Sequence, residues 1–149
     1  MIFKKNIEVR WSDIDANGHL NHTIYGEFCT NTRIAWMESI DYSIKNLLNM
    51  GLAAVLLKEQ TEYFCEIFLG ETVTVELYFA GISPDKSRWK FAHKIFNSKG
   101  KLSAINIVYG AWIEIKNRKI AAAPLAVVKK LEDLTKYEGF EMLVNLIDK

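Results

Sequence analysis

The chain has 149 residues, half of them hydrophobic, and its 19 basic and 18 acidic residues leave a net charge of only +1. This length is typical of a single domain, and the apolar content is sufficient for a buried core, which excludes extensive disorder. Because the charges are interspersed, the sequence lacks the basic stripe of a nucleic-acid-binding surface, and we expect no nucleic acid partner.

Cysteine usage and the distribution of apolar residues predict a cytoplasmic protein. Cys29 and Cys65 form no Cys-x-x-Cys pair, which is typical of buried thiols in a reducing compartment. The N-terminal segment lacks the apolar stretch of a signal peptide, and the longest apolar run, residues 51–57, is too short to span a bilayer. We therefore expect a cytoplasmic protein with no membrane span.

The first predicted elements are a strand, a loop and a helix. Apolar and polar residues alternate over residues 7–11, as in a half-buried strand. Residues 12–21 are rich in Asp, Asn and Gly and are predicted to form a loop. A long helix is expected from about His22, with Asn21 as its N-cap. One face of this helix is mostly apolar, so we expect that face to be enclosed. It comprises Tyr25, Phe28, Cys29, Thr32 and Trp36.

The rest of the chain is dominated by predicted strands. A short helix is expected from Tyr42 to Met50, before Gly51. Alternating or β-rich segments then predict strands over residues 72–79, 88–95 and 102–115, with a hairpin turn at residues 97–100 and closing helices over residues 125–134 and 138–147. His93, in the middle of a strand, is expected to be a core or interface histidine with satisfied hydrogen bonds.

This order of elements predicts an α+β fold. A strand, an enclosed helix and a series of antiparallel strands are typical of a sheet wrapped around a helix, in one domain over residues 1–149. A single sheet of this size leaves one face partly open, so we expect a homodimer or homotetramer.

The segment from Arg10 to Tyr25 contains most of the candidate metal-binding and catalytic residues. Its Asp13-x-Asp15-x-Asn17-Gly18 segment resembles half of a calcium-binding loop, but the required Glu at the twelfth position is replaced by Ile24. His19-x-x-His22 lacks the further ligands of a zinc site. The sequence also has no Gly-x-Ser-x-Gly motif, and Cys29 is better explained as a buried structural residue than as a nucleophile.

A loop carboxylate at the start of a helix remains as the best candidate. The first N–H groups of a helix lack partners and carry a partial positive charge, so they can polarise a carbonyl oxygen. A nearby carboxylate can attack that carbonyl or activate water, and a thioester suits such a site because a thiolate leaves without a strong acid. Asp13 is expected to order the loop by pairing with Arg10.

The loop also resembles a known family. Arg10-x-x-Asp13-x-Asp15-x-x-Gly18-His19-Leu20-Asn21-His22-x-x-Tyr25 is similar to the signature of 4-hydroxybenzoyl-CoA thioesterase-like proteins, which have the hot-dog fold. Weaker similarity at Tyr63, at residues 69–73 and at Ser87 extends the resemblance to about residues 5–130. Residues 131–149 are expected to form a helical extension outside the shared core.

The resemblance implies an acyl-CoA thioesterase that acts on an acyl-CoA or acyl-carrier-protein thioester without a cofactor. It implies catalytic roles for Asp15 and for His22, whose backbone N–H would polarise the carbonyl. It also implies substrate-binding or bracing roles for six further residues: His19, Asn21, Tyr25, Tyr63, Ser87 and Arg88. His22 replaces the second Asn of the family pattern, which leaves the preferred acyl group open. The alternative is a non-catalytic hot-dog module that binds an acyl thioester or a protein.

Overall fold

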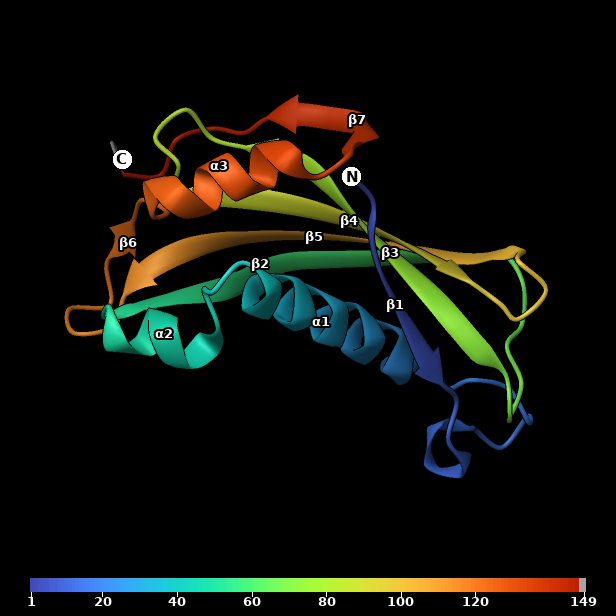
Figure 1. Ribbon diagram of the computed structural model, residues 1–149. Helices are drawn as coiled ribbons and strands as arrows, with labels where there is room; N and C mark the ends of the chain where they lie inside the picture. The colour runs from blue at the N-terminus through green and yellow to red at the C-terminus, as the bar shows by residue number, and fades with distance from the viewer. Residues whose placement is uncertain (148–149) are drawn as a thin grey trace.

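The computed structural model describes residues 1–147 and contains one sheet with helices against it (Figure 1). The strands run in the spatial order β1-β3-β4-β5-β2, with β6 beside β5 and β7 beside β3, and all pairs are antiparallel except β3–β7. The strands are β1 (Phe3–Glu8), β2 (Leu52–Tyr63), β3 (Thr72–Ile82), β4 (Arg88–Phe96), β5 (Leu102–Glu114), β6 (Ile120–Ala121) and β7 (Lys136–Met142). The helices are α1 (His22–Ser39), α2 (Ile44–Asn49) and α3 (Leu125–Asp133), with a 3₁₀ turn at Trp11–Asp13.

The long helix α1 lies along the inner face of the curved sheet (Figure 1). It begins where the sequence predicts, because the Asn21 side chain accepts a hydrogen bond from the Thr23 N–H at 3.0 Å. The predicted face of α1 is buried against the sheet, and it comprises Tyr25, Phe28, Cys29, Thr32 and Trp36. The α+β hot-dog architecture is therefore confirmed.

Two hydrophobic clusters hold the sheet to the helices. Around the N-terminal half of α1, Phe28 packs with Val75 and Ile95. Around its C-terminal half, α2 and α3 join the core, and Trp36 lies in one cluster with Val127 of α3. The inner space is thus divided along the axis of α1, with a separate environment at each end.

The first strand ends earlier than the alternation of residues 7–11 predicts. β1 stops at Glu8, and Trp11 is 82% exposed. The reason is local, since the Asp13 carboxylate accepts hydrogen bonds from the backbone and side chain of Arg10 and closes a 3₁₀ turn. Residues 10–13 therefore leave the sheet and begin the loop.

The C-terminal segment corrects a second expectation. Residues 136–142, placed mostly in a predicted helix, form strand β7 parallel to β3. Phe140 packs edge-on against Phe79 at 5.1 Å, and Gly139 disfavours a helix at this point. The pairing depends on β3, which is far away in the sequence. Residues 148–149 of the expected extension lie outside the described residues.

The other predicted elements are confirmed, with α2 and α3 inside their expected ranges and the turn at residues 97–100 joining β4 to β5. No helix within residues 1–147 is long and apolar enough to cross a membrane.

Candidate active site

The loop between β1 and α1 is held by an ion pair at its entrance. The Arg10 guanidinium donates to both carboxylate oxygens of Asp13, with Nη2–Oδ1 at 2.8 Å and Nε–Oδ2 at 3.2 Å. These hydrogen bonds from Arg10 lower the pKa of Asp13, whose side chain is almost fully buried. The Asp13 carbonyl also accepts the Asn21 N–H at 2.8 Å, which ties the loop to the start of α1. Asp13 is therefore a structural residue, as expected.

Asp15 lies at the bend of this loop with one carboxylate oxygen fixed. Its Oδ1 accepts the backbone N–H groups of Asn17 at 2.9 Å and His19 at 3.2 Å. The bend is closed by the Gly18 N–H on the Asp15 carbonyl, and Gly18 has a φ of +80°, which glycine adopts without strain. Asp15 Oδ2 accepts no hydrogen bond from residues 1–147, so one oxygen is held while the other is available.

The N-terminus of α1 supplies an unused donor beside this carboxylate. Asn21 caps the Thr23 N–H through its side chain and the Ile24 N–H through its carbonyl. Across the described chain, the His22 N–H has no hydrogen-bond partner. Such an uncapped N–H at a helix start carries partial positive charge and is suited to bind a carbonyl oxygen.

A pocket of about 310 Å³ joins these groups. It is lined by nine residues: Asp15, His19, Leu20, His22, Tyr25, Tyr63, Phe64, Cys65 and Glu66. Tyr25 and Tyr63 meet edge-on, with ring centroids 5.0 Å apart. Burial, with a smaller contribution from the neighbouring acidic groups, raises the pKa of Tyr25 to about 12, so its hydroxyl stays protonated. Five of the eight residues expected at the site therefore share one cavity.

The remaining three expected residues lie elsewhere in the chain. Asn21 is the helix cap beside the pocket, and it braces the site instead of lining it. Ser87 and Arg88 stand at the opposite end of the sheet, where β4 begins. Ser87 is fully buried and donates to Asp85 at 2.6 Å, so within one chain neither Ser87 nor Arg88 joins the Asp15 pocket.

The structure adds a residue that sequence reasoning missed. Glu66 lies 3.2 Å from His19 Nε2, and the His19 ring packs edge-on against Phe68. Glu66 thus orients His19 at the mouth of the pocket. No local pattern marks Glu66, since it follows β2 and meets the loop only through the tertiary fold.

Two alternative chemistries find no support in the described part of the chain. No three His, Cys, Asp or Glu side chains come together there as a metal-binding group. Cys29 is completely buried, which raises the pKa of its thiol and disfavours the nucleophilic thiolate. Among the described residues, the pocket thus contains the Asp15 carboxylate and the His22 N–H at the start of α1, which has no hydrogen-bond partner there.

Comparisons with known proteins agree with the fold. A 1,4-dihydroxy-2-naphthoyl-CoA thioesterase from Synechocystis superposes with a TM-score of 0.81 at 20% identity, over 90% of this chain and 98% of that one. A Staphylococcus aureus protein solved in complex with CoA gives a TM-score of 0.82 at 23% identity, over 98% of this chain and 90% of that one. A curated relative from Aquifex aeolicus is 25% identical over 125 residues, 84% of this chain and 94% of its own.

These similarities define a hot-dog protein. The model of the thioesterase-like superfamily matches residues 9–131, which include the Asp15 loop, α1 and the central strands. The chain belongs to the thioesterase-like superfamily.

Proposed function

We propose that this protein hydrolyses an acyl thioester of the acyl-CoA type, with Asp15 as the catalytic carboxylate. One observation supports the proposal most directly: Asp15 has one oxygen fixed and one available, in a pocket that also contains His22, whose backbone N–H has no partner among the described residues. Membership of the thioesterase-like superfamily and the fold shared with a CoA-bound protein support a CoA thioester as the substrate.

The reaction follows from the placement of these groups. The substrate carbonyl oxygen accepts the His22 N–H, which polarises the carbonyl carbon. In one route, Asp15 takes a proton from water, hydroxide adds to this carbon, the C–S bond breaks, and the proton passes from Asp15 to the leaving thiolate. In the other route, Asp15 adds to the carbon and the C–S bond breaks, which leaves a thiolate and an acyl anhydride on Asp15; water then hydrolyses the anhydride, regenerates the carboxylate and supplies the proton taken up by the thiolate. Both routes give a carboxylic acid and a free thiol.

Other pocket residues have supporting roles in this proposal. The His22 imidazole is exposed at the pocket and is positioned to hydrogen-bond the substrate. Tyr63, 51% exposed, and the buried Tyr25 form an aromatic wall for the acyl or pantetheine part of the substrate. His19, oriented by Glu66, lies at the polar side of the same pocket.

The proposal includes association of two copies through β2. This 12-residue strand pairs only with β5 among the described strands, and it exposes Leu56 and Leu57 by about half. A long edge strand with an exposed apolar segment is prone to pair with another chain, and a second copy of this chain would cover it.

The test of the proposed function is thiol release from short, medium, long and aromatic acyl-CoAs. Release from at least one member, with first-order dependence on enzyme, supports hydrolysis and identifies the acyl class. Saturable binding without release, both from acyl-CoA and from the corresponding acyl-carrier-protein thioester, would instead indicate a non-catalytic binding module.

A further inference from the structure

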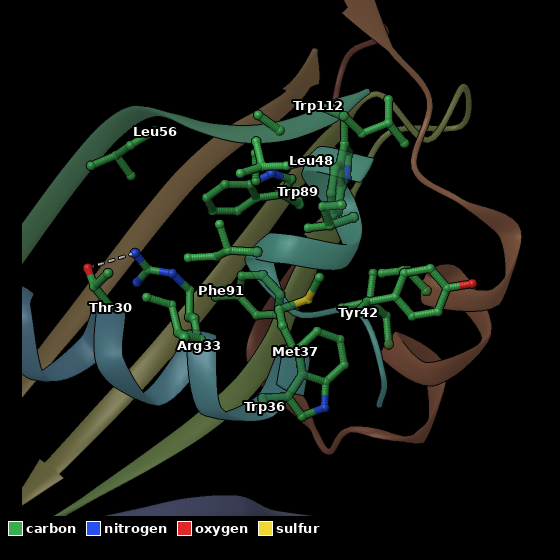
Figure 2. A pocket seen from close by; sticks show the side chains of 18 residues that line it. Thr30, Arg33, Trp36, Met37, Tyr42, Leu48, Leu56, Trp89, Phe91 and Trp112 are labelled. Atoms are coloured by element: carbon green, nitrogen blue, oxygen red, sulfur yellow. Dashed lines mark hydrogen bonds between the residues drawn. The ribbon is translucent and has the colours of Figure 1, made fainter. Parts of the chain in front are cut away.

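A second cavity, of about 380 Å³, lies under the C-terminal half of α1, away from the Asp15 pocket. It is enclosed by α1, α2, α3, β2 and the inner faces of β4 and β5 (Figure 2). Three tryptophans, Trp36, Trp89 and Trp112, contribute to a wall that is almost entirely apolar. Because a helix rises about 1.5 Å per residue, Arg33 at this cavity is about 16 Å from His22 along α1. The two sites are therefore distinct within one chain.

Arg33 is the one charged residue that lines this cavity in the described chain. Figure 2 shows its guanidinium beside Thr30 at one end of the cavity, with Trp112 and Tyr42 toward the other. Its Nη2 donates to Thr30 Oγ1 at 3.1 Å, and its Nη1 lies 3.3 Å from His93 Nε2. Both partners are neutral groups, and they use two of the five N–H donors of the guanidinium.

No carboxylate within residues 1–147 forms an ion pair with Arg33. The acidic residue that acts on it electrostatically is Glu59 of β2, whose Oε2 instead accepts the Asn106 amide at 3.2 Å. Burial lowers the pKa of Arg33, because the guanidinium has lost water without gaining a carboxylate. An anion at this position would restore the interaction that burial removes.

We propose that this cavity binds an amphipathic carboxylate of the fatty-acid class, with its apolar tail among the tryptophans and its carboxylate on Arg33. The planar guanidinium has parallel N–H groups that can bind both oxygens of a carboxylate. The apolar wall favours an alkyl tail by removing it from water, and the volume lies in the range of small-molecule sites. The inference stands on the cavity alone, although the acid released by the proposed hydrolysis belongs to the same chemical class.

The test is a binding titration that does not depend on hydrolysis. Decanoate and the uncharged decanol are titrated below their aggregation limits, and binding is followed by tryptophan fluorescence and calorimetry. A Trp11→Phe background removes the exposed fourth tryptophan, so that the signal reports the cavity. Decanoate should bind about 10- to 100-fold more tightly than decanol, as expected for a charge-assisted hydrogen-bonded pair.

Substitution of Arg33 then identifies the source of the preference. Arg33→Met should abolish the preference for decanoate while decanol still binds, which also shows that the cavity remains formed. Lys129→Met, on the exposed side of α3, should retain the preference of the parent protein. Glu59→Gln removes a nearby negative charge and should tighten decanoate binding without changing that of decanol.

Three results would overturn the inference. These are equal affinity of the parent protein for decanoate and decanol, no binding of either ligand, and a preference for decanoate that survives Arg33→Met. Each of them is independent of thiol release, so the cavity and the proposed hydrolysis fail separately.

Discussion

The buried His93 makes stability depend on pH in a way that can be calculated. Its side chain is fully buried under α1, with Nδ1 3.2 Å from the Asn106 carbonyl oxygen and Nε2 beside the Arg33 guanidinium. The neutral imidazole donates from Nδ1 and accepts at Nε2 in this arrangement. Burial, and secondarily the charge of Arg33, lowers the pKa of His93 to about 3.

The magnitude follows from the difference between the folded and unfolded pKa values. In the unfolded chain this histidine takes up a proton near pH 6.5, whereas the folded chain excludes the proton down to about pH 3. The unfolded state therefore binds more protons in this window, and stability falls as the pH decreases from about 6.5 toward 3. Between pH 7 and pH 5, His93 alone should reduce the free energy of unfolding by about 2 kcal/mol.

Urea unfolding at pH 7 and pH 5 measures this effect directly. His93→Gln keeps a donor and an acceptor without titrating, so its loss of stability on acidification should be about 2 kcal/mol smaller than that of the wild type. His22→Gln is the matched control at an exposed histidine, and it should keep the wild-type pH dependence. Equal pH dependence in the wild type and His93→Gln would refute the reasoning.

Three further predictions concern the loop, the core and the assembly. Asp13→Asn should lower the melting temperature at pH 7, measured by calorimetry. The difference in melting temperature from the wild type should shrink below about pH 4, because the lowered pKa of Asp13 stabilises the fold only where this carboxyl is ionised in the unfolded chain. An unchanged melting temperature at pH 7 would contradict this prediction. Gly110→Ala places a methyl carbon against the Trp89 ring, closer than van der Waals contact allows, and should lower the free energy of unfolding in urea by about 1–3 kcal/mol. This is more than expected for Gly139→Ala, where the nearest ring atom is 3.1 Å away. Sedimentation should give at least twice the 17.1 kDa chain mass, and a monomer at micromolar concentration would exclude pairing through β2.

The parts of the structure predicted correctly are those determined by short-range interactions. The start of α1 depends on Asn21 capping a residue two positions away, and its buried face follows from helical spacing. The Asp15 loop is likewise closed by hydrogen bonds that span at most four residues. These features can be deduced from neighbouring residues alone.

The features that were missed depend on contacts between distant segments. β7 is a strand because it pairs with β3, a partner far away in the sequence that the neighbouring residues do not reveal. The contact of Glu66 with His19 and that of Arg33 with His93 form only when the sheet wraps around α1. Ser87 was expected at the site from the weaker part of the family resemblance, but within one chain the length of β3 places it at the far end of the sheet, where β4 begins.

The central claim, that Asp15 acts on a thioester carbonyl at the start of α1, is tested most directly by thiol release from Asp15→Asn. The asparagine keeps an oxygen that can accept the two loop N–H groups, so the variant should fold normally and bind substrate. Its turnover should fall about 100- to 10,000-fold, as expected for loss of a general base, while Asn17→Ala, which keeps the backbone N–H, should remain active. Wild-type turnover in Asp15→Asn would contradict the account.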